Sequence, residues 1–225
     1  MISGFFAIGK EPTGSKDPFA LRRAAINIIK AIKKHEIRLS LNELIDKAIS
    51  QLPNIESNPK ITKKVVDFIM ERLKVILKDE GINHDIISAL MEQSNDILII
   101  CKKATILNEF IGTPVGERLI SIGKRAKNII DSNDGIEIDA SLFSEREEYE
   151  LFNALNKLEI KLSDIRKNET DINSRFTREL NACVDIEETV ENFFDKVLVN
   201  TEDSQVKQNR LNLVTKLAKI LETTV

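Results

Sequence analysis

Three cations and one amide lie within five consecutive residues, Lys124-Arg125-Ala126-Lys127-Asn128. On a helix, residues three or four apart share a face, so Lys124 aligns with Lys127, and Arg125 aligns with Asn128. Lysine and arginine side chains hold phosphates, and an asparagine amide can hydrogen-bond to a base edge. The segment is a candidate nucleic-acid-binding surface, and an ordinary solvated helix face is the alternative interpretation.

A second candidate surface lies near the end of the sequence, where Asp203 is expected to cap the last helix. Lys207 and Arg210 are three residues apart on this helix and share one face. Phosphate contact and a salt bridge to a partner fit this pair equally. Phe193 and Phe194 suggest base stacking, but Phe194 falls at core spacing, which favours packing.

A third candidate is basic and lies near the start of the chain. Asp17 is expected to cap a helix with Pro18 at its first position, because proline lacks the N–H that would go unpaired there. The partial positive charge of this helix start, together with Arg22, Arg23 and Lys16, would form a site for an RNA backbone. An interdomain salt bridge is the equally weighted alternative for the two arginines.

No catalytic residue and no metal site are expected. His84-Asp85 is the dipeptide of metal phosphohydrolases, whose chemistry requires several His and Asp ligands. The only other histidine is His35, so His84 is expected simply to start a helix. Cys101 and Cys183 lack metal or redox spacing, and the sequence predicts two buried thiols in a reducing compartment.

These residues are expected to be positioned by helices, because helical periodicity dominates and strand alternation is nearly absent. The predicted fold class is all-α, with helical bundle domains. The best domain boundary lies near residues 75–85 and divides the chain into residues 1–80 and 81–225. The expected helices cover about 17–34, 40 to before 53, 59–81, 84–93, 96–111, 115–131, 144–166 and 171–183, with two more that begin near Asp185 and Asp203. A capping box of Ser144 and Glu147 is expected to open the helix that ends near residue 166.

Charge is distributed unevenly along the chain. The net charge is only −3, but residues 1–40 carry +5 and residues 131–160 carry −7. Any site for an anion must therefore arise from local clustering. These opposite patches also suit a structural module that docks other domains. No apolar run approaches the roughly 18 residues of a membrane span, so a cytoplasmic protein without membrane contact is expected.

Several segments together resemble one known family, the beta subunit of bacterial heterotetrameric glycyl-tRNA synthetase. The resemblance covers essentially the whole chain and is looser between residues 145 and 184. It is carried by Gly4–Gly9, Pro12–Ala25, Lys124–Ile129, Ile138–Phe143, Phe193–Val199 and Asn209–Leu211.

The resemblance implies that this chain corresponds to the C-terminal third of such a subunit. Residues 1–80 would follow the family's HD-like domain, and residues 81–225 would form a DALR-like anticodon-binding helical bundle. The implied partners are tRNA-Gly, the alpha subunit and the rest of the beta chain. The alpha subunit would use ATP and magnesium to activate glycine, so this noncatalytic part of the ligase would hold no cofactor.

Overall fold

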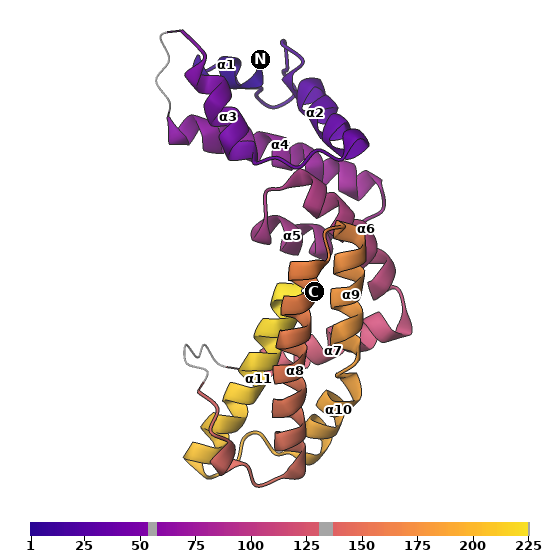
Figure 1. The fold of residues 1–225 in the computed structure, drawn as a ribbon. Helices are drawn as coiled ribbons and strands as arrows, with labels where there is room; N and C mark the ends of the chain where they lie inside the picture. Colours follow the sequence, from indigo (N-terminus) through magenta and orange to yellow (C-terminus); the bar gives the residue numbers. More distant parts are fainter. Residues whose placement is uncertain (54–57, 131–136, 225) are drawn as a thin grey trace. The chain divides into compact units, whose positions relative to one another are not determined.

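The computed structural model describes residues 1–53, 58–130 and 137–224. Helices dominate these residues, and no β-strand occurs among them apart from an isolated bridge between Thr13 and Lys16. The predicted all-α class is confirmed (Figure 1). The chain divides into two compact units, Met1–Asn108 and Glu109–Val225. Asp131 and Asp134, two acids of the predicted acidic segment, lie outside the described residues.

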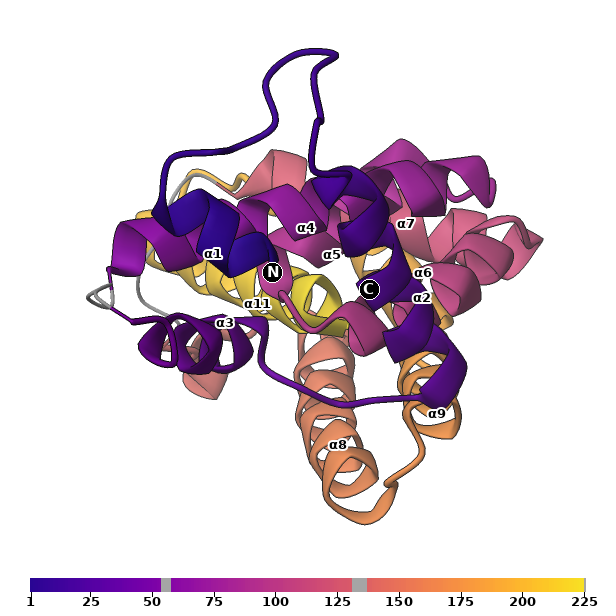
Figure 2. The ribbon, with the colours of Figure 1, turned by 90° about the horizontal axis from the view of Figure 1, so that it is seen from above.

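The first unit is organised around one long helix, α4. Its helices are α1 (Ile2–Ala7), α2 (Leu21–His35), α3 (Leu41–Ser50), α4 (Pro59–Asp79), α5 (His84–Gln93) and most of α6 (Ile97–Ile111). Helices α1, α2, α3 and α5 all pack against α4 (Figures 1 and 2). Their fully buried side chains include Leu21, Ile29, Leu41, Ile49, Leu73 and Leu77.

The units divide after Asn108, further along the chain than the expected boundary at residue 80. Polar contacts tie the later helices to the earlier ones in the first unit. Lys102 of α6 pairs with Glu36 at 2.9 Å, and Arg38 donates to Asp96 at 2.8 Å. The side chain of Asn108 also accepts from the Asn83 backbone N–H. Helices α5 and most of α6 therefore belong with the N-terminal helices.

Helix α2 begins later than the sequence predicts. The expected first residue was Pro18, but the helix starts at Leu21, after Ala20 in a left-handed conformation. Asp17 still caps the helix, because its two carboxylate oxygens accept from the backbone N–H groups of Leu21 and Arg22 at 2.8 and 3.0 Å. The intervening turn lets Phe19 stack on a phenylalanine of α1, Phe5, with ring centroids 4.2 Å apart.

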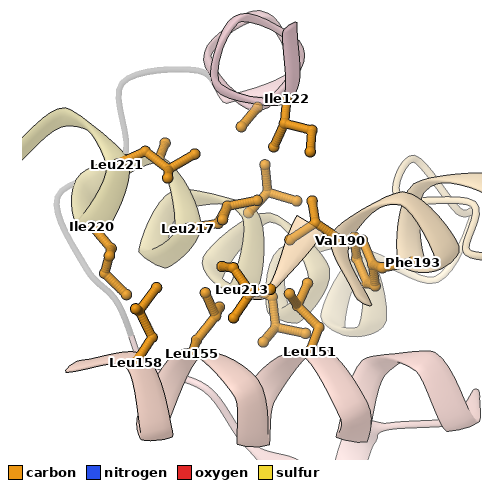
Figure 3. Close-up of a cluster of buried hydrophobic side chains, with 14 of the residues drawn as sticks. Ile122, Leu151, Leu155, Leu158, Val190, Phe193, Leu213, Leu217, Ile220 and Leu221 are labelled. Carbon is orange, nitrogen blue, oxygen red and sulfur yellow. The ribbon is translucent and has the colours of Figure 1, made fainter. Parts of the chain in front are cut away.

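The second unit is a bundle in which α11 lies between α7 and α8. Its elements are the end of α6, α7 (Pro114–Ile129), the short 3-10 helix η1 (Ala140–Leu142), α8 (Arg146–Asn168), α9 (Ile172–Val184), α10 (Glu187–Lys196) and α11 (Ser204–Thr224). In Figure 3, Leu213, Leu217 and Leu221 of α11 face Ile122 of α7 on one side and the leucines of α8 on the other. Phe193 and Phe194 are both buried in this core, which confirms packing for Phe194.

The start of α8 differs by one residue from the expected capping box. Glu148, rather than Glu147, returns to the helix start and accepts from the backbone N–H groups of Ser144 and Glu145. Glu147 instead pairs with Lys196 of α10. The shift leaves Glu148 completely buried, where its carboxylate can meet another element of the bundle.

The turn between α6 and α7 requires a glycine at position 116. Thr113 caps α7 by accepting from the Gly116 backbone N–H at 3.1 Å, and Pro114 occupies the first helical position. A Cβ at Gly116 would lie 2.0 Å from the carbonyl oxygen of Phe110. Residue 116 therefore lies directly against the backbone of Phe110 at the end of α6, and a side chain there would have to displace that backbone.

We predict that Gly116→Ala destabilises the second unit by about 1–3 kcal/mol, because the new methyl group must push the Phe110 backbone away. Gly123→Ala on the same helix is the matched control. Its Cβ would meet only Leu221 Cδ1 at 3.8 Å, and alanine has the higher helix propensity, by about 1 kcal/mol. Urea unfolding followed by circular dichroism measures both variants. Equal stability of the two would contradict the close-approach argument.

Candidate nucleic-acid interface

Helix α7 buries one face and exposes a polar ridge on the other. The buried face is formed by Leu119, Ile122 and Ala126. Lys124 and Asn128 lie opposite, one turn apart, and both are exposed without a side-chain partner in the described part of the chain. The ridge therefore pairs Lys124 with Asn128 rather than with Lys127. It presents one free ammonium group and one free amide, which suit a phosphate and a base edge respectively.

Arg125 lies on the flank of α7 that faces α10. Its Nη2 donates to the carbonyl oxygen of Phe194 at 3.1 Å, and its guanidinium lies 4.5 Å above the Phe194 ring. Arg118, seven residues earlier, pairs with Glu187, seven residues before Phe194. The two contacts show that α7 and α10 run side by side in the same direction. Arg125 remains about half exposed, so it can hold α10 and still face an anion.

Lys127 lies on the opposite flank and faces α11. Its Nζ is 3.0 Å from Glu222 Oε1, and both side chains are more than half exposed. An exposed ion pair of this kind contributes only about 0–1 kcal/mol. A phosphate can therefore replace Glu222 as the partner of Lys127 at little cost. The ridge and its two flanks bring all four predicted α7 residues to one side of the helix.

Arg210 is not available to an external ligand, which corrects the expectation of phosphate contact. The residue is buried, and its Nε and Nη2 donate to the two carboxylate oxygens of Glu148 at 3.0 and 3.1 Å. Nη1 donates to the Leu198 carbonyl at 2.9 Å, and Nη2 also reaches Ser144 Oγ at 2.9 Å. The structure thus shows an ion pair of Arg210 within the second unit.

The charge on Glu148 is maintained by these contacts. Burial raises the pKa of this carboxyl, but the hydrogen bonds from Arg210 and from the backbone N–H groups of Glu145 and Ser144 outweigh burial. The net result is a pKa below the usual value of 4.5. Glu148 and Arg210 are therefore both ionised at neutral pH, and they form a buried ion pair rather than a neutral hydrogen-bonded pair.

Lys207 is separated from the predicted RNA-binding cations of α7. It lies in the first turn of α11, is partly buried, and has no ion-pair partner among the residues that the structure describes. Glu222, the partner of Lys127, is fifteen residues later on the same helix, roughly 22 Å along its axis. Lys207 is thus not part of the α7 surface.

The three N-terminal candidates lie in the first unit and have different environments. Arg22 Nη2 donates to the Gly14 carbonyl at 2.5 Å and so holds the loop before α2. Lys16 and Arg23 are exposed. The expected anion site at the helix start is not open, because Asp17 occupies the N–H groups of Leu21 and Arg22. Only the exposed side chains are left to meet RNA here.

A polar groove between α8 and the α9–α10 segment was not predicted. It encloses about 760 Å³, and its lining includes Asn153, Lys157 and Asn192. None of these three side chains has a hydrogen-bond or ion-pair partner among the described residues, whereas Lys161 in the same groove pairs with Asp185. The only sequence signal was the spacing of Asn153 and Lys157, four residues apart on α8. The groove itself requires α10, which is distant in sequence.

The described residues contain no group of three or more His, Cys, Asp or Glu side chains that could hold a metal ion. His84 begins α5 as expected, and Asn83 caps the helix by accepting from the Asp85 backbone N–H at 2.8 Å. Burial raises the pKa of Cys101 to about 11 and that of Cys183 to about 12, so both are protonated thiols at neutral pH. Among the helices of residues 1–53, 58–130 and 137–224, none is long and apolar enough to cross a membrane.

Comparison with known proteins gives two family matches and a set of relatives. Residues 1–92 match the glycyl-tRNA synthetase beta subunit family, and residues 117–225 match the DALR anticodon binding domain. A glycine–tRNA ligase beta subunit of Ruegeria sp. (strain TM1040) is 34% identical over 97% of this chain and 31% of its own length. The Rhodospirillum centenum subunit is 34% identical over 99% of this chain and 31% of its own length. The Actinobacillus pleuropneumoniae serotype 5b subunit is 32% identical over 97% of this chain and 32% of its own length. The chain thus spans about a third of the length of these relatives.

We predict that Glu148→Gln lowers the free energy of unfolding by about 3–5 kcal/mol at pH 7, because it leaves the Arg210 charge buried without a counter-charge. The folded-state pKa of Glu148 is depressed, so its contribution is present above pH 4.5 and is lost as the pH falls through the folded-state pKa. The difference between wild type and variant should therefore shrink below about pH 4.

Urea unfolding between pH 7 and pH 3 measures this difference. Glu150→Gln is the matched control, since Glu150 pairs with Arg146 at an exposed position one turn along α8 and its loss should cost about 0–1 kcal/mol. A loss of stability in Glu148→Gln that stays constant across this pH range would contradict the ionised pair.

Proposed function

Because the chain belongs to the glycyl-tRNA synthetase beta subunit family, we propose that it is the tRNA-binding, anticodon-recognising part of a glycine–tRNA ligase. The proposal rests on two independent features that both fall in the second unit. The match to an anticodon-binding domain covers residues 117–225, almost the whole of the second compact unit. The free cation and free amide of the α7 ridge lie in that same unit.

In this proposal, α7 holds the anticodon arm by its backbone and contacts a base. Lys124 binds a phosphate, and Arg125 and Lys127 add charge on the two flanks of the helix. Asn128 hydrogen-bonds to the edge of an unpaired base, which a single-stranded loop can offer and a duplex cannot. The phosphate contacts set the position of the RNA, and the amide contact is the one that can discriminate.

The second unit is acidic as a whole, and in this proposal its charge restricts the place where RNA can bind. The unit contains 16 Lys and Arg residues against 23 Asp and Glu residues, a net charge of −7. A polyanion is not attracted to such a surface as a whole. RNA should therefore approach where cations gather and be repelled elsewhere, so that α7 restricts where the RNA can bind.

In this proposal the catalytic step takes place outside this chain. Activation of glycine with ATP and magnesium would take place in the alpha subunit, in the cytoplasm. This chain would contribute no catalytic residue and no cofactor site. Its partners would be tRNA-Gly, the alpha subunit and the rest of the beta chain.

The second candidate function is a structural module that docks the alpha subunit or other domains without binding RNA. The net charge of −7 on the second unit favours it, because acidic surfaces attract basic proteins. Calorimetry distinguishes the two functions. Tight binding to the alpha subunit without any affinity for tRNA-Gly would favour docking.

We predict that Lys124→Gln weakens binding of tRNA-Gly and reduces the slope of log K against log salt by about 0.7–0.9, because one phosphate contact is lost. Asn128→Ala should weaken binding without changing the slope, since the amide carries no charge. It should also reduce the preference over an anticodon-swapped transcript. Filter-binding titrations between 50 and 200 mM salt measure both quantities.

Arg146→Gln is the control for loss of one positive charge in the same unit, because Arg146 pairs with Glu150 on α8. Its slope should remain that of the wild type. An unchanged slope in Lys124→Gln would remove α7 from the RNA interface. Absence of any tRNA affinity in the wild-type chain would overturn the proposed function itself.

A further inference from the structure

The outer face of α2 carries an unbroken stripe of polar side chains. Its members, spaced by four, three and four residues, are Arg23, Asn27, Lys30 and Lys34, hereafter the α2 stripe. All four are exposed. The opposite face of the helix is buried against the first unit through Leu21, Ala25, Ile29 and Ile32. The stripe therefore points away from the core over 11 residues, roughly 16 Å of helix axis.

The cations of the α2 stripe have no counter-charge in the described part of the chain. Three acids near α2, namely Asp17, Glu36 and Glu80, are each engaged with other groups. Asp17 accepts from backbone N–H groups at the start of α2, and Glu36 pairs with Lys102. Glu80 pairs with Lys33, which lies beside the stripe on α2. The stripe itself contains no acid, although like charges four residues apart, such as Lys30 and Lys34, destabilise a helix.

The composition of the α2 stripe favours a nucleic-acid backbone over a protein as its partner. Protein interfaces have an apolar or aromatic core, and lysine is depleted in them. The stripe has no apolar member. Phosphates along an RNA strand require only repeated cations and neutral hydrogen-bond donors. Arg23, Lys30, Lys34 and the amide of Asn27 supply these groups along a single line.

We propose that the α2 stripe is a second RNA-backbone contact, in a different compact unit from the α7 ridge. The inference rests on the proposed function, since it assigns a further contact to the same RNA. Arg22 donates to the Gly14 carbonyl and so holds the preceding loop. The exposed Lys16 lies in this loop, shortly before Arg23, the first residue of the stripe. The α2 stripe binds phosphates of the tRNA body and supplies affinity without reading sequence.

The test is tRNA-Gly binding by the full chain carrying Arg23→Gln, Lys30→Gln and Lys34→Gln together. The slope of log K against log salt should become shallower by roughly 2–3, about 0.7–0.9 for each lost contact. Because phosphate contacts carry no sequence information, affinity for tRNA-Gly and for an anticodon-swapped transcript should fall by the same factor.

The matched control removes three cations from α4 of the same unit, Lys60→Gln, Lys74→Gln and Lys78→Gln. These positions are also exposed, but Asp67 and Glu71 lie between them. The control should keep the wild-type slope. An equal change of slope in both triple variants would show an effect of overall charge and would overturn the proposed role of the α2 stripe.

Two further outcomes also overturn the inference, and they differ from failure of the proposed function. A wild-type slope in the α2 variant, with a reduced slope in Lys124→Gln, would leave α7 as an RNA contact and exclude α2. A wild-type slope with lost binding to the alpha subunit would identify the stripe as a protein-docking surface. If the unmodified chain bound no tRNA at all, the proposed function and the stripe would both be wrong.

Discussion

The buried ion pair between Arg210 and Glu148 is the interaction on which the second unit depends most. Removing two charges from water costs several kcal/mol per ion, and only a set of well-placed hydrogen bonds can offset that cost. Glu148 meets this need by capping α8 while it binds Arg210, and Arg210 adds the Leu198 carbonyl. The pair thereby fixes the start of α8, the α10–α11 connection and the first half of α11. Since α7 packs on α10 and α11, the candidate RNA surface rests on this junction.

The first half of α11 carries further buried polar side chains, and these also hydrogen-bond to backbone groups of another segment. Asn209 donates to the Asp139 carbonyl at 2.9 Å and accepts from the Asp139 backbone N–H at 2.8 Å, as a neighbouring strand would. Asn212 donates to the Glu137 carbonyl at 2.6 Å. These side chains satisfy backbone groups of Glu137 and Asp139, which lie outside the helices. The apolar side chains of α11 that form the core seen in Figure 3 are Leu213, Leu217, Ile220 and Leu221.

The helices could be predicted from sequence because their apolar positions repeat at helical spacing, and Asp17 was recognisable as a cap. The roles of the arginines could not. Arg22, Arg125 and Arg210 all lie on helices and were all predicted to meet RNA, yet one holds a loop, one faces both α10 and solvent, and one is buried. Arg210 meets Glu148, which lies 62 positions earlier in the chain. A cation's type and spacing are the same whether it faces water or a carboxylate, so only the fold distinguishes these cases.

The two units differ in net charge, and in the proposal they have different roles in binding tRNA. The first unit has 17 Lys and Arg residues against 13 Asp and Glu residues, whereas the second has an excess of acids. Contacts with phosphate strengthen binding of every tRNA alike, so the α2 stripe alone cannot select one. Selection requires hydrogen-bonding groups that face bases, and in the proposal the exposed Asn128 of the α7 ridge is such a group. An acidic surrounding weakens binding wherever the RNA is displaced from α7, which makes discrimination by a single amide more effective than it would be on a uniformly basic surface.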